Sequence, residues 1–403
     1  MRIRIVVIFL LQSFVCSTFA QVKRTFNVYL RSNSGTITLW DGKTTNIYGM
    51  ASRLSEEPPL PARILYANEG DTVVLNALSI SQGEHHTIHL HGLDVDTRND
   101  GDPATSFWLQ HMQDTTYTFV ARHAGTYLYH CHVADVVHVQ MGMYGLIVVK
   151  AKDGKNTAWT NGPTYDKEYK WLTSELDKRW HDTVPVHDPA VDSVHIPPYK
   201  PHYFLVNGKS HQQIVADDSI SVSGAQNQFI YVRVGNIGFY DNNIVFPSYL
   251  NANIIASDGR PLPTSVRSDT LHISPGERYE VMLNPSLQKQ DTIRVYYVNM
   301  NTHMAEGMEK IPVNIQGMAA IKNMTVNENN TFTVYPNPAT AVLHVKLKTP
   351  INTLFIYDAL GRLTEKIAVN ERDELSIDLN NLPKGLYFIR SEKNNSGSSF
   401  VIE

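Results

Sequence analysis

The segment TYLYHCHVADVVHVQMGMYG, residues 126–145, concentrates side chains that bind soft metal ions. Cys131 lies between two histidines, His138 follows seven residues later, and methionines follow at positions 141 and 143. A thiolate, two imidazoles and a weak axial thioether form the blue, electron-transferring type 1 copper centre. Cys131 and His138, with either Met141 or Met143, therefore supply three of the four ligands of such a centre. Zinc is the alternative metal, but zinc does not call for an axial methionine.

Strand periodicity divides this segment between two metal sites. Successive side chains of a strand point to opposite faces of the sheet. His130 and His132 therefore face one way, and Cys131 between them faces the other. One tripeptide can then contribute to two sites, one on each side of the sheet.

A second segment, EHHTIHLHGLDVD at residues 84–96, supplies further histidines. By the same alternation His89 and His91 share a face, while His86 faces the opposite way. We therefore predict that His86 completes the type 1 site with Cys131. The other face is predicted to carry a four-histidine cluster that binds a second, catalytic copper, formed by His89, His91, His130 and His132.

Two carboxylates closely follow these histidines in the chain. Asp94 or Asp96 could relay protons to the four-histidine cluster, and Asp94 is the candidate catalytic residue. Equally, both could be ordinary turn carboxylates. The histidines outside the two segments, at no ligand spacing, are interpreted as structural or surface residues.

The first residues, 1–20, read as a secretory signal peptide: two arginines, an apolar run and small residues before Gln21. Cys16 would leave with the signal, so the mature chain keeps Cys131 alone and cannot form an internal disulfide. A lone thiol outside the cell is open to oxidation unless a bound metal occupies it. The formal net charge of −4, without a long run of one sign, gives no support for a nucleic-acid partner.

Short alternating apolar runs cut by turns predict an all-β chain of 403 residues. Two β-sandwiches are expected, over residues 21–150 and 166–322. Polar, turn-rich stretches at 151–165 and 323–330 are expected to be linkers. Residues 331–403 are expected to form a small C-terminal β-sandwich without a cluster of metal-binding side chains.

The two histidine-rich segments resemble those of multicopper oxidases and the wider cupredoxin family. Two family patterns, His-x-x-His-x-His-Gly and His-Cys-His with a later His and Met, match His86, His89, His91, Gly92, His130, Cys131, His132, His138 and Met143. The His138-to-Met143 interval favours Met143 over Met141 as axial ligand. The Cys131-to-His138 interval is longer than in most laccase-type members, so the loop over the copper should differ. The resemblance implies cupredoxin-like Greek-key sandwiches, a type 1 copper and type 2- or type 3-like copper at the histidine cluster.

Half of the ligands that this resemblance implies are missing. Oxidases of the family reduce O2 at a three-copper cluster held by four His-x-His pairs in two domains, whereas this chain has two such pairs. The second block resembles a second cupredoxin domain through FLVNGK, YVRVGNIG, IIASDGRPL and SPGERYEVML. Residues 295–308 resemble a decayed type 1 site and also a stretch of copper nitrite reductases. Met300 occupies the position of a copper-binding histidine of those reductases, and His303 follows three residues later. Asp258 occupies the position of their second, catalytic histidine.

Three functional hypotheses follow. The first is a copper-dependent oxidase that takes single electrons from a small-molecule or metal-ion reductant at the type 1 copper and reduces O2 at the histidine cluster. The second is a nitrite-reductase-like enzyme with type 1 and type 2 copper. The third is a non-enzymatic extracellular copper-binding or electron-transfer protein. Two-domain relatives are typically trimers, so the resemblance also implies a homotrimer.

The C-terminal block resembles the sorting domain of the type IX secretion system. The matching motifs are Tyr335-Pro336-Asn337-Pro338, Ile356-Tyr357-Asp358 with Gly361-Arg362, and Leu382-Pro383-Lys384-Gly385-Leu386-Tyr387. The resemblance implies the type IX secretion machinery as a partner. It also implies a secreted or cell-surface protein that passes through the periplasm.

Overall fold

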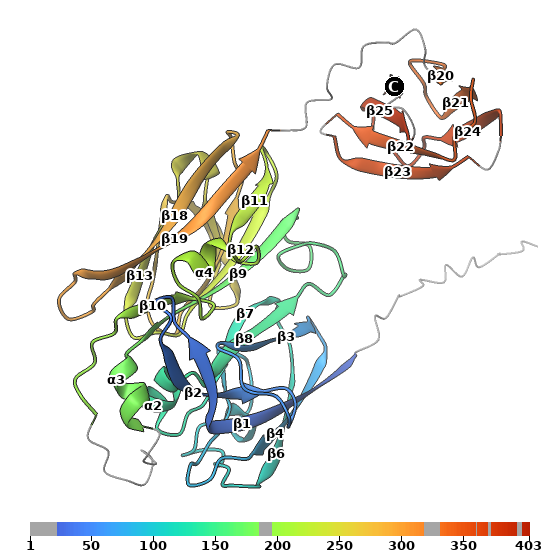
Figure 1. Ribbon diagram of the computed structural model, residues 1–403. Coiled ribbons are helices and arrows are strands. Elements are labelled where there is room, and N and C mark those ends of the chain that lie inside the picture. The colour runs from blue at the N-terminus through green and yellow to red at the C-terminus, as the bar shows by residue number, and fades with distance from the viewer. Residues whose placement is uncertain (1–21, 185–195, 318–330, 360, 370–371, 393–396) are drawn as a thin grey trace, which may run out of the picture.

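The computed structural model shows three successive strand-rich units (Figure 1), which confirms the all-β prediction. It describes residues 22–184, 196–317, 331–359, 361–369, 372–392 and 397–403. The predicted signal peptide and the second predicted linker, residues 323–330, lie outside the described residues.

The first unit is a sandwich of two four-stranded sheets, in the orders β2-β1-β4-β6 and β3-β8-β7-β5. Its strands are β1 (Lys23–Thr38), β2 (Thr44–Ala51), β3 (Ala62–Asn68), β4 (Thr72–Ser79), β5 (His89–His91), β6 (Asp114–Val120), β7 (Gly125–His130) and β8 (Tyr144–Lys150). The pairs β1–β4 and β3–β8 are parallel, and the other pairs are antiparallel. The inward side chains of both sheets form one core that includes Cys131.

The second unit repeats this architecture with larger sheets, in the orders β10-β9-β12-β17-β14-β15 and β11-β19-β18-β13-β16. Its strands are β9 (Lys167–Leu176), β10 (Tyr203–Val206), β11 (Val222–Ala225), β12 (Ile230–Asn236), β13 (Asp241–Val245), β14 (Asn253–Ser257), β15 (Arg260–Arg267), β16 (Thr270–Ile273), β17 (Arg278–Leu283), β18 (Lys289–Val298) and β19 (Ala305–Gln316). Along β19, buried Ile311, Val313 and Ile315 alternate with the half-buried Pro312 and the exposed Asn314 and Gln316, as a half-buried strand requires.

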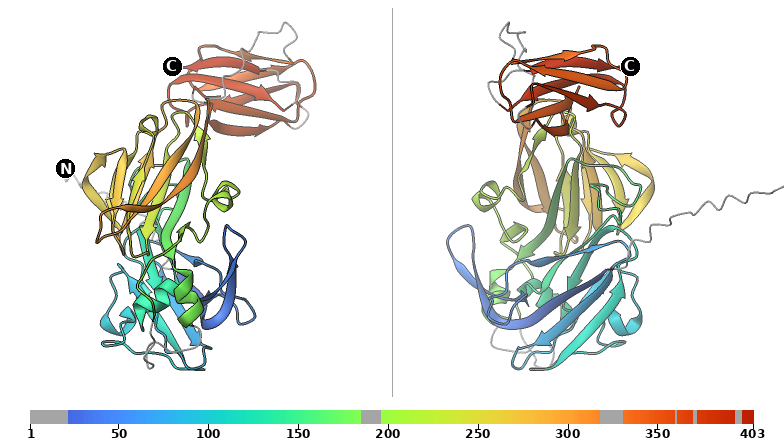
Figure 2. Two further views of the ribbon diagram at one scale, coloured as in Figure 1. Left: turned by 60° about the vertical axis from the view of Figure 1, so that its left-hand side comes forward. Right: turned by 90° about the vertical axis from the view of Figure 1, so that its right-hand side faces the viewer.

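The third unit, at the C-terminal end of the chain, packs two smaller sheets against each other (Figure 2). One sheet is β20-β21-β24 and the other is β23-β22-β25-β26. The strands are β20 (Phe332–Tyr335), β21 (Val342–Leu347), β22 (Thr353–Asp358), β23 (Leu363–Ala368), β24 (Glu374–Asp378), β25 (Gly385–Ser391) and β26 (Gly397–Ile402).

The helices are short: α1 (Thr97–Asp100), α2 (Asp135–Met141), α3 (Lys178–Thr183), α4 (Gln212–Val215) and the 3-10 turn η2 (Ser248–Leu250). In the described part of the chain, no helix has the length and apolar character needed to cross a membrane.

The α2 helix carries His138 over the core of the first unit. Gly142 ends the helix with a φ of 115°. A Cβ atom at Gly142 would lie 2.9 Å from the Tyr48 carbonyl oxygen, so the chain can turn back here only without a side chain. The N–H of Met143 then donates to the His138 carbonyl oxygen. The longer interval that the sequence predicts between Cys131 and His138 therefore leads into a short helix, which begins at Asp135 and ends after His138 in a tight glycine turn.

The first and second units touch where β7 crosses the start of β17 and the β14–β15 turn. A Cβ atom at Gly125 would lie 2.6 Å from the Gly259 Cα, so two glycines allow the backbones to meet. The Thr126 hydroxyl donates to Glu280, which is paired with the fully buried Arg233 at 3.2 Å. These contacts join the second unit to the start of β7, the strand whose other end carries His130.

Candidate metal centres

The structure brings His86, Cys131 and His138 together inside the first unit. The Cys131 Sγ atom lies 3.6 Å from the Nδ1 atom of His86 and 3.2 Å from that of His138. All three side chains are fully buried, and their donor atoms lie within 4.8 Å of one another. The far ring nitrogen of His86 hydrogen-bonds the Ser81 hydroxyl at 2.8 Å, which leaves Nδ1 facing the thiol. This soft, converging donor set fits copper.

Glu84 is the outer partner of His138, and the sequence prediction missed it. Its Oε2 atom accepts a hydrogen bond from the His138 Nε2 at 3.1 Å, and its Oε1 atom accepts one from the Tyr48 hydroxyl at 2.8 Å. Burial lowers the pKa of His138, but Cys131 and Glu84 more than offset it and raise that pKa to about 9. The anions that hold a proton on this ring also favour a metal cation in its place. Glu84 lies two residues before His86, but its contact with His138, 54 positions away, leaves no signal in the local sequence pattern.

Met141 and Met143 are both fully buried in the core that contains Cys131. The Cys131 N–H donates to the Met143 carbonyl oxygen at 3.0 Å, which ties the two residues together through the backbone. The axial role of Met143 stays a prediction.

The predicted four-histidine cluster assembles on the other side of the sheet. Strand pairing sets His89 opposite His130, and the donor atoms of His89, His91 and His130 lie within 4.8 Å of one another. The His132 ring lies beside this group, with its centroid 5.0 Å from that of His89 and 5.7 Å from that of His130. Burial lowers the pKa of His130 to about 3 and that of His91 to about 4, so both imidazoles are neutral and offer lone pairs to a metal.

Two aspartates that the sequence prediction did not select support this cluster. The His89 Nδ1 donates to the Asp100 carbonyl oxygen at 2.8 Å and lies 3.5 Å from the Asp100 carboxylate. The Asp102 carboxylate lies 3.9 Å from the His132 Nδ1. Gly101 between them has a φ of 80°, and a Cβ atom there would lie 1.9 Å from a backbone carbonyl oxygen. The signal that could have found these residues is the Asp-Gly pair, because such a turn can approach a neighbouring strand closely.

Asp94 and Asp96 point to other partners. Asp94 pairs with Arg260 at 2.7 Å and with His123 at 3.3 Å, and its side chain is half exposed. Asp96 caps α1 by accepting from the Asn99 N–H at 3.0 Å. Within the described residues, no hydrogen bond or ion pair joins either aspartate to the four histidines. A proton-relay role for Asp94 stays a prediction.

The second unit meets the cluster with a glycine and an arginine. A Cβ atom at Gly276 would lie 3.2 Å from the His91 ring, so the backbone passes directly beside it. Arg278 next to it is buried and pairs with Asp258 at 2.9 Å, and its charge contributes to the lowered pKa of His91. Asp258 occupies the position that the resemblance gives to a catalytic histidine, and in this structure it forms an ion pair with Arg278.

The β18–β19 hairpin does not assemble the predicted remnant of a type 1 site. Tyr297 is fully buried in the core of the second unit, whereas Asn299 hydrogen-bonds Glu306 at the hairpin end. Met300 is 48% exposed, and His303 lies in the exposed turn with a φ of 57°. Among the described residues, the two clusters above are the groups of three or more His, Cys, Asp or Glu side chains close enough to hold one metal ion.

Comparison with known families agrees with this geometry. Two adjoining family models, both described as Multicopper oxidase, match residues 54–154 and 155–333, and together they span more than half of the chain. A model described as Secretion system C-terminal sorting domain matches residues 333–403. The chain belongs to the multicopper oxidase family, whose cofactor is copper. Its C-terminal sorting domain indicates a secreted or cell-surface protein.

The individual proteins that match this chain share a third or less of the aligned residues and are longer than the matched segments. Copper resistance protein A of Escherichia coli is 34% identical over 127 residues, covering 31% of this chain and 19% of that protein. A copper-containing nitrite reductase of Neisseria meningitidis serogroup B is 29% identical over 181 residues, 44% of this chain and 43% of that protein. The L-ascorbate oxidase of Cucumis sativus is 24% identical over 338 residues, which cover 77% of this chain and 54% of that protein. This chain therefore spans about half or less of these relatives.

A solved structure, the blue copper oxidase from Nitrosomonas europaea, matches with a TM-score of 0.58 at 25% identity. The match covers 73% of this chain and 86% of that chain. A copper nitrite reductase from the same organism matches with a TM-score of 0.55 at 17% identity, covering 73% of this chain and 94% of that chain. At this identity the match supports the fold alone.

Proposed function

We propose that the protein is a secreted copper-dependent oxidase that takes single electrons from a reductant at one copper site and delivers them to a second site that reduces O2. One observation carries the proposal: Cys131 belongs to one donor cluster, and the adjacent His130 belongs to the other. The two clusters are therefore joined by one peptide unit, which is the shortest covalent route that a chain can provide.

When bound, copper supplies one-electron redox chemistry at the first cluster and reacts with O2 at the second. The residues that would hold the first ion are His86, Cys131, His138 and the axial Met143. Those that would hold copper at the second cluster are His89, His91, His130 and His132. Burial keeps water from the thiol, and Glu84 and Ser81 hold the two imidazoles of the first cluster in place. At the second cluster, the Asp100 carbonyl oxygen accepts a hydrogen bond from the His89 Nδ1 and orients that ring, and the Asp102 carboxylate lies 3.9 Å from the His132 Nδ1.

Export and assembly belong to the same proposal. The signal peptide would carry the chain into the periplasm, and the C-terminal unit would then engage the type IX secretion machinery. A homotrimer would bring the second unit of a neighbouring chain to the four-histidine cluster. Sedimentation of the purified protein tests this state, and a monomer at all concentrations would exclude the trimer.

Metal analysis of the purified protein is the first test. About four copper ions per protomer, with near-ultraviolet absorption, would support a complete O2-reducing centre. About two would indicate a type 1 site with a mononuclear partner, and about one would indicate an electron carrier. O2 consumption with a phenol or cuprous ion, compared with nitrite consumption under anaerobic conditions, assigns the reaction. Nitrite consumption without O2 uptake, or one copper per protomer, would overturn the oxidase proposal.

A further inference from the structure

The helix that carries His138 also presents a polar side chain to the second unit. Gln140 follows His138 by two residues on α2, and residues at this spacing do not face the same side of a helix. His138 contacts the thiol of the first cluster, whereas Gln140 contacts the end of β9 in the second unit. Gln140 is only 7% exposed, so its amide needs hydrogen-bond partners inside the protein.

Backbone groups of the second unit bond both ends of the Gln140 amide. The Nε2 atom donates to the Glu175 carbonyl oxygen at 2.7 Å, and the Oε1 atom accepts from the Asp177 N–H at 2.8 Å. These two backbone groups lie on either side of Leu176, the last residue of β9. We call this pair of bonds the Gln140 clamp.

The clamp continues a strand pairing that stops just before it. The parallel pairing of β12 with β9 reaches Asn236 and Thr173, and the Ile237 N–H then donates to the Thr173 carbonyl oxygen at 3.0 Å. The next carbonyl oxygen with the same backbone direction along β9 is that of Glu175, which Gln140 bonds. The side chain of the first unit therefore occupies the position that a further residue of β12 would take.

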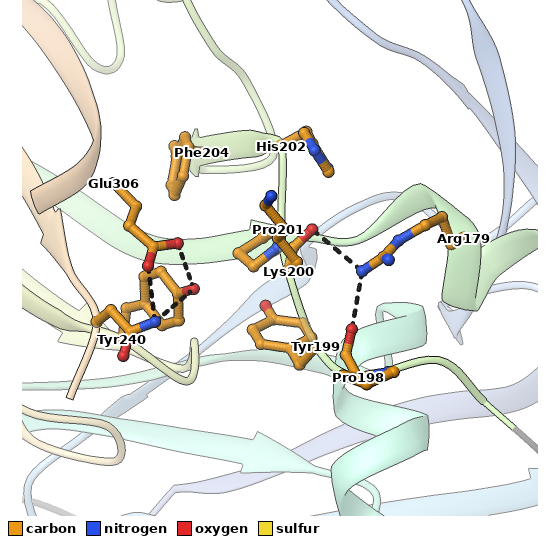
Figure 3. A pocket seen from close by; sticks show the side chains of 10 residues that line it. Arg179, Pro198, Tyr199, Lys200, Pro201, His202, Phe204, Tyr240 and Glu306 are labelled. Atoms are coloured by element: carbon orange, nitrogen blue, oxygen red, sulfur yellow. Dashed lines mark hydrogen bonds between the residues drawn. The ribbon is translucent and has the colours of Figure 1, made fainter. Parts of the chain in front are cut away.

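The part of the second unit that receives the clamp is held by hydrogen bonds of its own. The Asp177 carboxylate accepts from the backbone N–H groups of Arg179 at 3.1 Å and Lys200 at 2.8 Å. The Arg179 guanidinium donates to the Pro198 carbonyl oxygen at 2.8 Å (Figure 3). The same loop lines a cavity of about 670 Å³ around Lys200, so close packing alone does not hold it in place.

Apolar packing brings α2 against the second unit but does not fix its orientation. Val139 on α2 shares a buried apolar cluster with Leu172 and Ile237 of the second unit. Apolar contacts are non-directional, so they allow the helix to slide or rotate. The two bonds of Gln140 have defined directions, and they therefore set where α2 sits along the end of β9.

The position of α2 determines the geometry of the first cluster. The His138 Nδ1 lies 3.2 Å from the Cys131 Sγ, and the Met143 N–H donates to the His138 carbonyl oxygen at 3.0 Å. Cys131 directly follows β7, so a shift of α2 moves His138 and Met143 relative to the thiol. Loss of the clamp would leave a buried carbonyl and a buried N–H without these partners, which favours such a shift.

We propose that Gln140 is a positioning residue of the first metal site, through which the second unit sets how His138 meets the Cys131 thiolate. The inference rests on the proposed function, in which this site accepts the electron. It gives the second unit a role at the first site although that unit contributes none of the proposed ligands.

The test compares Gln140→Met with wild type on the copper-loaded protein, because methionine has a similar length but can form neither bond. The readouts are the blue absorption band, the copper hyperfine splitting in electron paramagnetic resonance, and competition for copper with a chelator. Gln140→Met should shift the band and the splitting. It should also lower the copper affinity of the first site about 10-fold, as the loss of an outer support of a metal ligand does. Copper at the histidine cluster should be retained.

Two further variants complete the test. Gln213→Met is the matched control, because the Gln213 Nε2 also joins the two units by donating to the Thr38 carbonyl oxygen at 3.0 Å. It should leave the band, the splitting and the copper affinity unchanged. Gln140→Asn keeps the amide on a shorter side chain, and it should shift the spectra less than Gln140→Met does.

The outcomes that overturn the inference are distinguishable. Unchanged spectra and copper affinity in Gln140→Met, even with a lower melting temperature, would show that the clamp only stabilises the fold, and would leave the oxidase function intact. Equal shifts in Gln213→Met would overturn the assignment to Gln140. Should Gln140→Met fail to fold, a shift in Gln140→Asn supports the inference and its absence overturns it. A copper-loaded wild type without a blue band would overturn the type 1 site, and the inference with it.

Discussion

Replacing Glu84 by glutamine tests whether the first cluster is tuned by a buried carboxylate. The substitution keeps the shape of the side chain and one acceptor oxygen, and it removes one negative charge. That charge faces the outer nitrogen of His138, while Cys131 faces the inner one. Since a negative charge favours the oxidised, more positive copper, its removal should raise the reduction potential of the type 1 centre.

The size of the effect follows from the geometry. One imidazole ring separates the carboxylate from the metal-binding nitrogen, so the charge acts from about 7 Å, which at an effective dielectric of about 20 amounts to about 2.4 kcal/mol. For a one-electron couple this corresponds to a rise of about 100 mV. Glu84 is 4% exposed and His138 is fully buried, so solvent screens little of it.

Redox titration of the blue absorption band measures this potential. Glu57→Gln, which changes an exposed carboxylate of the same unit, is the control and should leave the potential unchanged. A potential that does not rise in Glu84→Gln, although the blue band persists, would refute the assigned coupling between Glu84 and the metal. Loss of the blue band would instead show that the carboxylate is needed to assemble the site.

Three further predictions follow. Cys131→Ser should abolish the intense blue band because it removes the thiolate, and an unchanged band would contradict the type 1 assignment. Gly101→Ala should clash with the Ile88 carbonyl oxygen and displace His89, so metal analysis should find copper lost from the histidine cluster while the blue band persists. Burial raises the pKa of Glu175 from 4.5 to about 8, so wild-type stability should fall as pH rises between these values, because only the unfolded chain ionises freely there. Glu175→Gln should lack this fall in stability. The test is the difference in melting temperature between about pH 5 and about pH 9, and an equal difference in the two proteins would contradict the prediction.

Local periodicity accounts for much of the candidate site. Alternation along two short strands separates His86 and Cys131 from His89 and His91, and the structure places these residues on opposite sides of the sheet in the same grouping. The prediction succeeds because the direction of a strand side chain depends on its position in the strand and needs no knowledge of distant contacts. The conformation of the segment from Cys131 to Gly142 could not be predicted in this way, because α2 begins only at Asp135 and its end, after His138, depends on the space beside Gly142.

The sequence by itself specified the donor types, their division between two faces and the β class of every unit, because these depend on residue chemistry and on a two-residue period. It could not specify the neighbours of each donor. Glu84 reaches His138 across 54 positions, and Arg278 and Gly276 come from the second unit to stand beside His91. The cavity around Lys200 likewise gathers residues from separate strands and loops. Such contacts depend on how the sheets pack, and packing is set by the whole chain and not by any local pattern.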